Sequence, residues 1–340
     1  MAVMFGTAIA ASGLRKAYKD KTVLDGIDLD VPAGTVFSML GPNGAGKTTT
    51  VNVLTTLLVP DAGKAVVAGH DVASDTRAVR RAIGVTGQFA AVDDLLTGEE
   101  NLLMMAKLLH LPKAEGKQVA GRLLDRFDIA DAAGKPVATY SGGMRRRLDL
   151  AMTLVSRPQI IFLDEPTTGL DPRSRLTLWA IVRELVADGV TIFLTTQYLE
   201  EADKLADRVA VLDHGRIVAE GTPAELKRKV PGSHIRLRFR DQRELHAGAA
   251  VLPGATRDDD ALSLHVPGDG GMKTYRALLA RLDEHAVDVE EMSLHTPDLD
   301  DVFLALTGNA SDPADTNGTS GTSGTSKTPD TNDTNTAVNA

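Results

Sequence analysis

Two short stretches of this sequence carry residue types at spacings that suit phosphate chemistry. In the first, Gly41 and Gly46 are separated by four residues and followed directly by Lys47 and Thr48. Glycines let a backbone curl so that successive N–H groups point at a polyphosphate, the lysine supplies charge for the outer phosphates, and the threonine hydroxyl is a ligand for Mg²⁺. The predicted nucleotide-binding loop comprises Gly41, Pro42, Asn43, Gly44, Ala45, Gly46, Lys47, Thr48 and Thr49.

The second stretch ends in two adjacent carboxylates, Asp164 and Glu165, which follow the apolar residues 160–163. An apolar run of this length is typical of a buried strand, and ligands of open α/β sheets bind at the carboxyl ends of such strands. We expect Asp164 to hold Mg²⁺, directly or through water, and Glu165 to orient or deprotonate an attacking water. A surface turn is the simpler alternative, and the apolar run argues against it.

A third candidate is YSGGMRRRLDLA at 140–151, where a serine and two glycines precede a helical pattern. Ser141 is suited to cap that helix, and Gly142 and Gly143 leave backbone N–H groups open to an anion. A second phosphate site is therefore one interpretation. An ordinary capped helix with a basic exposed face is the other, and these residues alone leave both open.

A framework of strands and helices must position these groups. Residues 36–40 predict a buried strand that leads into the glycine-rich turn, and apolar residues recur at helical spacing after it. The apolar positions of that helix are Val51, Leu54, Leu57 and Leu58. The same reasoning predicts strands at 82–86, 160–163, 190–195 and 208–213, and a helix at 175–186 whose apolar positions are Leu176, Trp179, Val182 and Leu185.

Two smaller units are expected around this α/β core. Residues 8–31 alternate apolar and polar positions around turn signals, which predicts a small antiparallel sheet. Thr97 and Glu100 form a capping box before an apolar helix, and 113–127 predicts a second amphipathic helix. We therefore expect a helical subdomain at about 89–156.

After a Pro-Gly pair at 231–232, the pattern changes to short alternating strands. Their apolar residues are Ile235, Leu237 and Phe239, then Leu262, Leu264 and Val266, then Val287 and Val289, with a helix at 275–282 before the last strand. We expect a nucleotide-binding domain at 1–230 and a small α+β accessory domain at 231–307. The apolar stripe Leu299, Val302, Phe303 and Leu306 predicts a helix that is core, or that docks within a dimer or onto its own nucleotide domain.

Composition limits the remaining possibilities. The tail at 308–340 contains almost no apolar residue and is expected to be disordered. No run of about 18 apolar residues occurs and no secretory signal is recognised, so we expect no unaided membrane span. Cysteine is absent, which excludes disulfides, and the net charge of -9 argues against a nucleic-acid partner.

In combination and order, these motifs resemble the ATP-binding subunit of ABC transporters over residues 8–228. The resemblance rests on the glycine-rich loop at 41–48, Gln88 after a strand, SGGMRRRLDLA at 141–151 and IIFLDEP at 160–166. It implies a P-loop ATPase fold with a RecA-like core, an antiparallel β-subdomain and a helical subdomain. It also implies ATP and Mg²⁺ as cofactors.

The resemblance further implies roles for single residues. Tyr18 would stack on adenine, although a half-buried strand tyrosine fits its local sequence equally well. Gln88 would contact Mg²⁺ or the attacking water and sense a membrane subunit, and Asp171 would cross a dimer interface. Ser141 and Gly143 would bind the γ-phosphate held by the opposite subunit, so each complete site would need two copies of the chain.

This chain departs from the family pattern at the switch position, where Gln197 stands in place of the usual histidine. Glutamine can donate a hydrogen bond to a γ-phosphate oxygen but cannot carry a positive charge. We expect slower or differently tuned hydrolysis, because Glu165 is retained. Tyr140 and Met144 also replace the usual leucine and glutamine of the signature sequence, without removing Ser141 or its glycines.

Within the family, the sequences at 195–227 and 299–308 resemble the daunorubicin-resistance ATP-binding proteins. That resemblance implies a peripheral ATPase on the cytoplasmic face of the membrane, commonly two copies working with a separate permease to export hydrophobic antibiotics. Export of lipid or polysaccharide is an alternative. A soluble ABC ATPase acting on DNA or ribosomes is a further alternative, disfavoured by the single nucleotide domain and the lack of a basic stripe.

Overall fold

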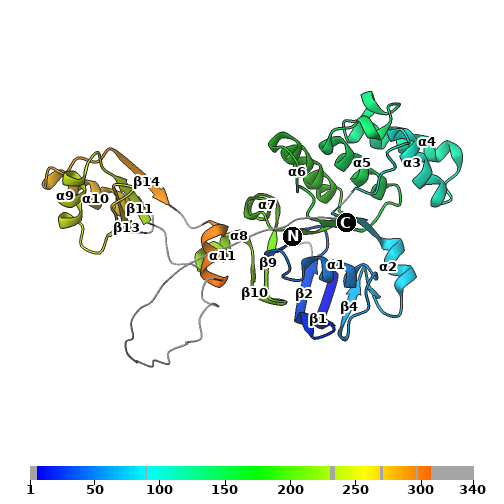
Figure 1. Cartoon of the computed structure of the whole chain (residues 1–340), viewed down its shortest axis with the longest axis horizontal. Helices are drawn as coiled ribbons and strands as arrows, with labels where there is room; N and C mark the ends of the chain where they lie inside the picture. The colour runs from blue at the N-terminus through cyan, green and yellow to red at the C-terminus, as the bar shows by residue number, and fades with distance from the viewer. Residues whose placement is uncertain (1–5, 89, 230–233, 269–270, 296–297, 308–340) are drawn as a thin grey trace, which may run out of the picture.

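The computed structural model describes residues 6–88, 90–229, 234–268, 271–295 and 298–307. The predicted disorder of the tail at 308–340 lies outside the described residues. A six-stranded sheet forms the centre of the larger unit, in the order β10-β9-β3-β8-β7-β6 (Figure 1). Its strands are β3 (Val36–Leu40), β6 (Ile83–Thr86), β7 (Ile160–Asp164), β8 (Thr191–Thr196), β9 (Arg208–Asp213) and β10 (Arg216–Gly221).

The strands from β9 to β6 run parallel, so their carboxyl ends meet at one edge of the sheet. Leu40 at the end of β3 pairs with Thr196 of β8, and Asp164 of β7 pairs with Thr195. All side chains of β3, β7 and β8 are buried, as expected for a parallel sheet covered on both faces. The glycine-rich turn, Glu165 and Gln197 therefore begin at this edge, each directly after one of these three buried strands.

One face of the central sheet packs against a second, antiparallel sheet, which confirms the expectation for residues 8–31. Between the two sheets lie the rings of Phe37, Phe162 and Phe193, within a core that also takes in α1 and α2. The elements on this side are β1 (Thr7–Tyr18), β2 (Lys21–Pro32), β4 (Ala62–Val67), β5 (His70–Asp71), α1 (Lys47–Leu54) and α2 (Thr76–Ala82).

The other face is covered by helices that share one hydrophobic core (Figure 1). The capping box predicted at Thr97 and Glu100 is present at the start of α3. Within the described residues, no helix has the length and apolar content to cross a bilayer. The helices of this unit, apart from α1 and α2, are α3 (Gly98–Leu108), α4 (Lys113–Arg126), α5 (Gly142–Leu154), α6 (Pro172–Ala187), α7 (Leu199–Leu205) and α8 (Pro223–Lys229), with single 3₁₀ turns at Ala130–Ala132 and Val137–Thr139.

Two details of these helices differ from the sequence predictions. Helix α1 ends at Leu54 and does not extend to Leu58, because Thr56 adopts a positive φ of 65° and leaves Leu57 exposed to solvent. Leu176 has helical spacing with Trp179 of α6 but is itself 61% exposed, so it lies outside the buried face of the helix.

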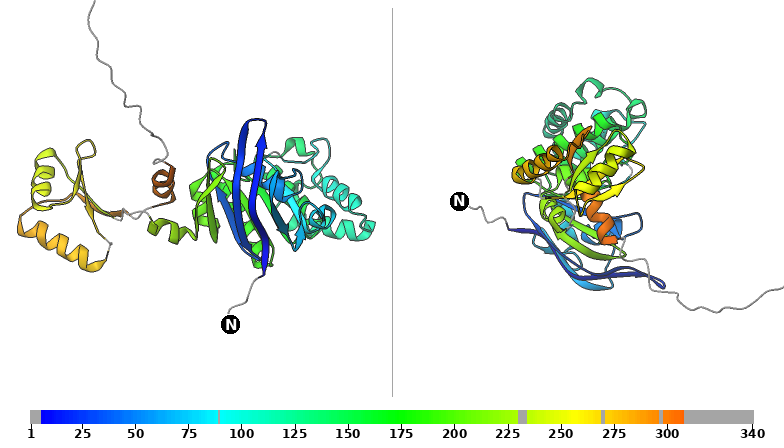
Figure 2. Two further views of the ribbon diagram at one scale, coloured as in Figure 1. Left: turned by 90° about the horizontal axis from the view of Figure 1, so that it is seen from below. Right: turned by 90° about the vertical axis from the view of Figure 1, so that its left-hand side faces the viewer.

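The C-terminal residues form a separate small sheet with its own apolar core, in the order β12-β13-β11-β14. Its chain order is strand, helix, two strands, helix, strand, and both helices lie on one face (Figure 2). The elements are β11 (His234–Arg238), α9 (Gln242–Val251), β12 (Thr256–Asp258), β13 (Ser263–Pro267), α10 (Met272–Glu284) and β14 (Glu291–His295). We call the described residues of 234–295 the C-terminal unit.

The sequence predictions were wrong for two parts of this unit. Helix α9 was not predicted, and the last strand lies at β14 and not at Val287 and Val289. The two valines are partly buried against the core of the unit, which explains their apolar character without a strand. The strand itself is fixed by antiparallel pairing of β14 with β11.

Helix α11 (Leu299–Thr307) leaves the C-terminal unit and packs beside α8 and α7 (Figure 1). Leu299 and Val302 are buried against Val209, Val211 and Leu226. Of the predicted alternatives for this stripe, docking onto the chain's own nucleotide-binding part is the one observed. We call residues 6–229, where described, together with α11 the core unit.

Candidate nucleotide site

The glycine-rich turn connects the end of β3 to the start of α1 through close backbone contacts. A Cβ atom on Gly41 would lie 2.3 Å from the carbonyl oxygen of Leu212, so the position has no room for a side chain. Gly46 has a φ of +114°, and a Cβ there would lie 2.9 Å from the carbonyl oxygen of Val23. The spacing of glycines in the sequence is therefore required by the packing of this loop.

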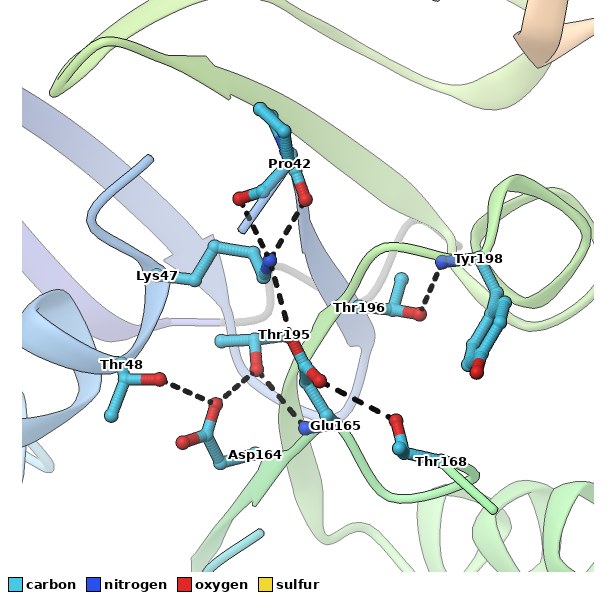
Figure 3. Close-up of polar contacts among 10 residues, drawn as sticks. Pro42, Lys47, Thr48, Asp164, Glu165, Thr168, Thr195, Thr196 and Tyr198 are labelled. Atoms are coloured by element: carbon cyan, nitrogen blue, oxygen red, sulfur yellow. Dashed lines mark hydrogen bonds and ion pairs between the residues drawn. The ribbon is translucent and has the colours of Figure 1, made fainter. Parts of the chain in front are cut away.

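Lys47 is the first residue of α1 and is only 4% exposed. Its Nζ donates hydrogen bonds to the carbonyl oxygens of Gly41 (2.8 Å) and Pro42 (3.1 Å) (Figure 3). The same atom lies 3.2 Å from Oε1 of Glu165. The two most distinctive charged residues of the sequence motifs are therefore in direct contact.

Asp164 lies next to the first turn of α1. Its Oδ1 accepts hydrogen bonds from Oγ1 of Thr48, at 3.3 Å, and from Oγ1 of Thr195 (Figure 3). A carboxylate and a hydroxyl oxygen side by side are hard oxygen donors of the type that bind Mg²⁺ together with phosphate oxygens and water. The donor set therefore fits the predicted metal.

Glu165 adopts the left-handed backbone conformation, with a φ of 47°. This conformation costs a non-glycine residue on the order of 1–3 kcal/mol and persists only where the surroundings enforce it. Here the Glu165 N–H donates to both the carbonyl oxygen and Oγ1 of Thr195, each at 3.1 Å, and Thr168 Oγ1 donates to Glu165 Oε2 at 3.4 Å. The backbone turn aims the carboxylate at Lys47 and not along the strand direction.

A cavity of about 450 Å³ lies over these groups and is lined by three separate segments besides Glu165. Gln88, two residues after the end of β6, is one of the lining residues. Lys21 and Val23 of β2 also line it and were missed; their signal was position alone, just after the hairpin that follows Tyr18. Tyr18 is half exposed, with Lys16 Nζ 5.9 Å from its ring centroid, and is not among the lining residues. The full lining is Lys21, Val23, Asn43, Gly44, Gly46, Lys47, Thr48, Thr49, Gln88 and Glu165.

The helix predicted after Ser141 is α5, and Ser141 Oγ accepts a hydrogen bond from the Met144 N–H at 3.2 Å. Gly143 packs against α6 so closely that a Cβ would lie 2.4 Å from Ser174 Oγ. A second cavity of about 350 Å³ is lined by residues that include Gly142, Gln88 and Glu165. Gln88 and Glu165 therefore border both cavities.

The three arginines of α5 do not form the basic exposed face considered from the sequence. Arg145 pairs with Asp94 at 2.9 Å and Arg147 with Asp128 at 3.0 Å. Arg146 is buried, and its guanidinium donates hydrogen bonds to backbone carbonyls of segments that are distant in the sequence. Charge alone cannot reveal such partners in a sequence.

Asp171 and Gln197 complete the set of predicted residues. Asp171 is the N-cap of α6, and Ser174 donates to its carboxylate from N–H at 3.0 Å and from Oγ at 2.5 Å. These hydrogen bonds hold the pKa of Asp171 below its usual value. Gln197 is half-buried and directly follows β8, the strand between β3 and β7, so it emerges at the edge that carries Lys47 and Glu165.

Comparison with known sequences is consistent with this geometry. Residues 24–168 match the ABC transporter family. The chain is 51% identical over 308 residues to the daunorubicin resistance ATP-binding protein DrrA3 of Streptomyces coeruleorubidus, covering 90% of this chain and 98% of that protein. It is 51% identical over 314 residues to the daunorubicin/doxorubicin resistance protein DrrA of Streptomyces peucetius, covering 91% and 95%. Identity to the Nod factor export ATP-binding protein I of Rhizobium sp. (strain N33) is 37% over 317 residues, covering 90% and 98%.

Solved structures resemble the larger part of the chain. The structure of cbiO1 from Clostridium perfringens, part of the ABC transporter complex cbiONQ, has a TM-score of 0.61 and 26% identity, covering 66% of this chain and 94% of that one. The buried strands, the glycine-rich loop with its lysine, and the adjacent carboxylates agree with the sequence matches. This chain is an ATP-binding subunit of the ABC transporter family, in the group that includes the daunorubicin-resistance ATP-binding proteins.

Proposed function

We propose that this chain powers the export of a hydrophobic antibiotic through a separate membrane permease. As an ABC ATPase it binds and hydrolyses ATP to drive transport. Identity of 51% to drug-resistance proteins, against 37% to Nod factor export proteins, supports a drug as cargo over the alternative of a lipid or polysaccharide. The cbiO1 protein is part of a transporter complex, which supports a permease partner at the cytoplasmic face of the membrane.

The observation that carries the catalytic proposal is the contact of Lys47 with Glu165, beside Asp164. Lys47 would bind the outer phosphates, and Glu165 would orient or deprotonate the attacking water. Thr48 and Asp164, with Gln88 nearby, would hold Mg²⁺, whose charge would stabilise the phosphate oxygens. Gln197 would donate a hydrogen bond to the γ-phosphate.

We further propose that each complete site is formed by two copies of the chain. Ser141, Gly142 and Gly143 would bind the γ-phosphate held by Lys47 of the partner, and Asp171 would lie at the interface. Support comes from the first turn of α5, which begins at Gly142 and contains no acidic residue. ATP then holds the dimer together, and its hydrolysis releases it.

The chain is proposed to divide into a nucleotide-binding domain at 1–230, with a helical subdomain at about 89–156, and an accessory domain at 231–307. The separate apolar core of the C-terminal unit supports the boundary near 231. The packing of α11 against α8 supports moving this helix from the accessory domain to the nucleotide-binding domain, so that the accessory domain would end before Leu299.

The decisive experiment is Glu165→Gln in the chain co-purified with its permease in lipid vesicles. ATP turnover should fall at least about 100-fold, because the general base is lost. The variant should bind ATP and form a stable dimer, whereas Glu99→Gln, an exposed change, should match the parent. Unchanged turnover, or a monomer in the presence of ATP with and without permease, would contradict the proposal.

Two further measurements address Gln197 and the cargo. Gln197→Ala should slow turnover, and Gln197→His should raise it, because histidine adds a positive charge near the γ-phosphate. Equal turnover in both variants and the parent would remove the role of Gln197. An anthracycline such as daunorubicin should stimulate ATPase activity of the complex, and stimulation by lipid or polysaccharide alone would favour the alternative cargo.

A further inference from the structure

Arg146 and Asp149 lie one turn apart on α5 and are both buried, at 6% and 3% exposed. Arg146 Nη1 lies 3.3 Å from Asp149 Oδ2. None of the roles proposed above uses this pair. Each buried ion costs several kcal/mol unless its remaining polar atoms are satisfied, so the other contacts of the pair indicate its purpose.

The guanidinium of Arg146 is bonded to both loops that carry the proposed catalytic side chains. Nε donates to the carbonyl oxygen of Pro166 at 3.0 Å, and Nη2 to that of Asp164 at 3.3 Å. These two residues stand on either side of Glu165. Nη1 donates to the carbonyl oxygen of Gly87 at 2.6 Å, and Gly87 directly precedes Gln88.

Asp149 holds the other side of the Gln88 segment. Its Oδ1 accepts a hydrogen bond from the Ala91 N–H at 3.0 Å. Gln88 therefore lies between a carbonyl bound by Arg146 and an N–H bound by Asp149. Both side chains project from α5, the helix that begins just after Ser141.

The shape of arginine explains why this residue type is needed. A planar guanidinium offers five N–H donors in fixed directions, whereas a lysine ammonium is a compact charge on a flexible stem. The acceptors at Gly87, Asp164 and Pro166 come from the segment after β6 and from the end of β7 with the loop that follows it, and Asp149 comes from α5 itself. One guanidinium can bond all of them at once, and one ammonium group cannot hold the same geometry.

We propose that Arg146 and Asp149 form a clasp that fixes Gln88 and Glu165 relative to the Ser141 end of α5, with Arg146 as a positioning residue for hydrolysis. The inference rests on the roles proposed above for Gln88 and Glu165. If the permease displaces Gln88, the Gly87 carbonyl moves with it and pulls on Arg146. Arg146 then shifts the backbone on either side of Glu165, to which it is also bonded, and shifts α5, from which it projects. The clasp therefore couples the permease to the hydrolysis rate and leaves ATP affinity to the glycine-rich loop.

The test uses the full chain with its permease in vesicles and two clasp variants. Arg146→Lys keeps the positive charge but loses the planar arrangement of N–H donors. The double variant Arg146→Gln/Asp149→Asn removes both buried charges together, so that neither charge is left without its partner. The matched control is Arg147→Gln/Asp128→Asn, which removes an ion pair from the same helix whose aspartate is 92% exposed.

In both clasp variants we expect kcat to fall at least about tenfold while the KM for ATP changes less than about threefold, because a small misplacement slows chemistry more than binding. Stimulation of ATPase activity by the permease should be lost. The control variant should match the parent in all three measurements. Thermal unfolding of each variant shows whether a fall in kcat at nearly constant KM comes from misplaced groups or from a general loss of folding.

Distance measurements give a second readout. The sequence contains no cysteine, so Leu57→Cys, after α1, and Leu108→Cys, at the end of α3, accept spin labels at exposed positions without background. In a Glu165→Gln background, ATP should shift this distance in the parent and shift it less in the clasp variants.

Folded clasp variants with the parent's kcat, permease stimulation and distance shift would overturn the clasp. A failure of the proposed catalytic roles would look different, because Glu165→Gln would then retain turnover. If Glu165→Gln is inactive and the clasp variants match the parent, only the clasp is wrong.

Discussion

The core unit and the C-terminal unit treat charged side chains in opposite ways. In the core unit, Lys47, Arg146, Asp149, Asp164 and Glu201 are each at most 6% exposed. In the described part of the C-terminal unit, Ser263 is the only polar side chain that is buried, and the core is formed by apolar side chains.

This difference indicates that the core unit is built for chemistry, whereas the C-terminal unit is built for packing alone. Charges removed from water interact more strongly and are already oriented when the reaction begins, which is what phosphoryl transfer requires. Holding them costs stability, and the parallel sheet with cores on both faces provides the packing to offset that cost. The C-terminal unit carries no such cost, which suits a scaffold or a docking part.

The largest effect should come from removing a buried cation of the core unit. Lys47→Ala should lower ATP turnover at least about 100-fold, because the outer phosphates lose their charge partner and Glu165 loses its cation. Arg236→Ala, which removes an exposed cation of β11, should change turnover less than about twofold. Steady-state ATPase assays measure the turnover of both variants. Similar losses of turnover in Lys47→Ala and Arg236→Ala would contradict the proposed difference between the two units.

A truncation in the C-terminal core should unfold that unit alone. Leu264 is fully buried, so Leu264→Ala should cost about 2–5 kcal/mol, whereas Leu294→Ala, at 38% exposed on β14, should cost less than about 1 kcal/mol. Trp179, the single tryptophan, lies in α6 and reports only on the core unit. In Leu264→Ala, circular dichroism should therefore show the C-terminal unit unfolding at a lower denaturant concentration. The unfolding midpoint measured by tryptophan fluorescence should stay that of the parent. A shift in the fluorescence midpoint would show that the two cores unfold together.

A truncation in helix α11 should destabilise the core unit, although this helix follows the C-terminal unit in sequence. Leu299→Ala should lower the fluorescence midpoint by an amount equivalent to about 2–4 kcal/mol, because this side chain packs into the core unit. Leu304, at 67% exposed on the same helix, is the matched control and should have little effect. An unchanged midpoint for Leu299→Ala would show that α11 does not stabilise the core unit.

The smallest effect concerns pH. Burial raises the pKa of the Glu201 carboxyl above its ordinary value of 4.5, while Trp179 Nε1 donates to Oε1 at 3.1 Å. The folded protein then retains a proton that the unfolded chain has released, so stability falls as pH rises from 4.5 through the folded-state pKa. Glu201→Gln keeps an acceptor for Trp179 and cannot ionise. Its melting temperature should therefore fall less over this range than that of the parent, and an equal slope would rule out Glu201 as the source.

The sequence was sufficient where the signal is local. The loop from Gly41 to Thr48, the two carboxylates at the end of β7 and the caps at Thr97 and Ser141 are all set by neighbouring residues, and all were predicted. Arg146 was missed because its partners are backbone carbonyls of segments 18 to 59 residues away. A run of three arginines shows no sign of such partners.

Helix α9 was missed for a different physical reason. Its start did carry a signal, since Asp241 caps the helix by accepting from the Glu244 N–H at 2.9 Å. The apolar stripe was interrupted by Gly248, which occupies a position where a Cβ would lie 2.6 Å from the Phe239 ring. Glycine has a low helix propensity, and here it is required by a tertiary contact with Phe239, which directly follows β11. Single-sequence periodicity cannot represent that contact.

Helices α8 and α11 lie against one another, although the whole C-terminal unit separates them in the chain. The entry and exit of that unit are therefore neighbours on one patch of surface, as in a domain inserted into a host. A module with such adjoining ends can be exchanged during evolution, or excised and bridged by a short linker, without moving the strands that carry the phosphate chemistry.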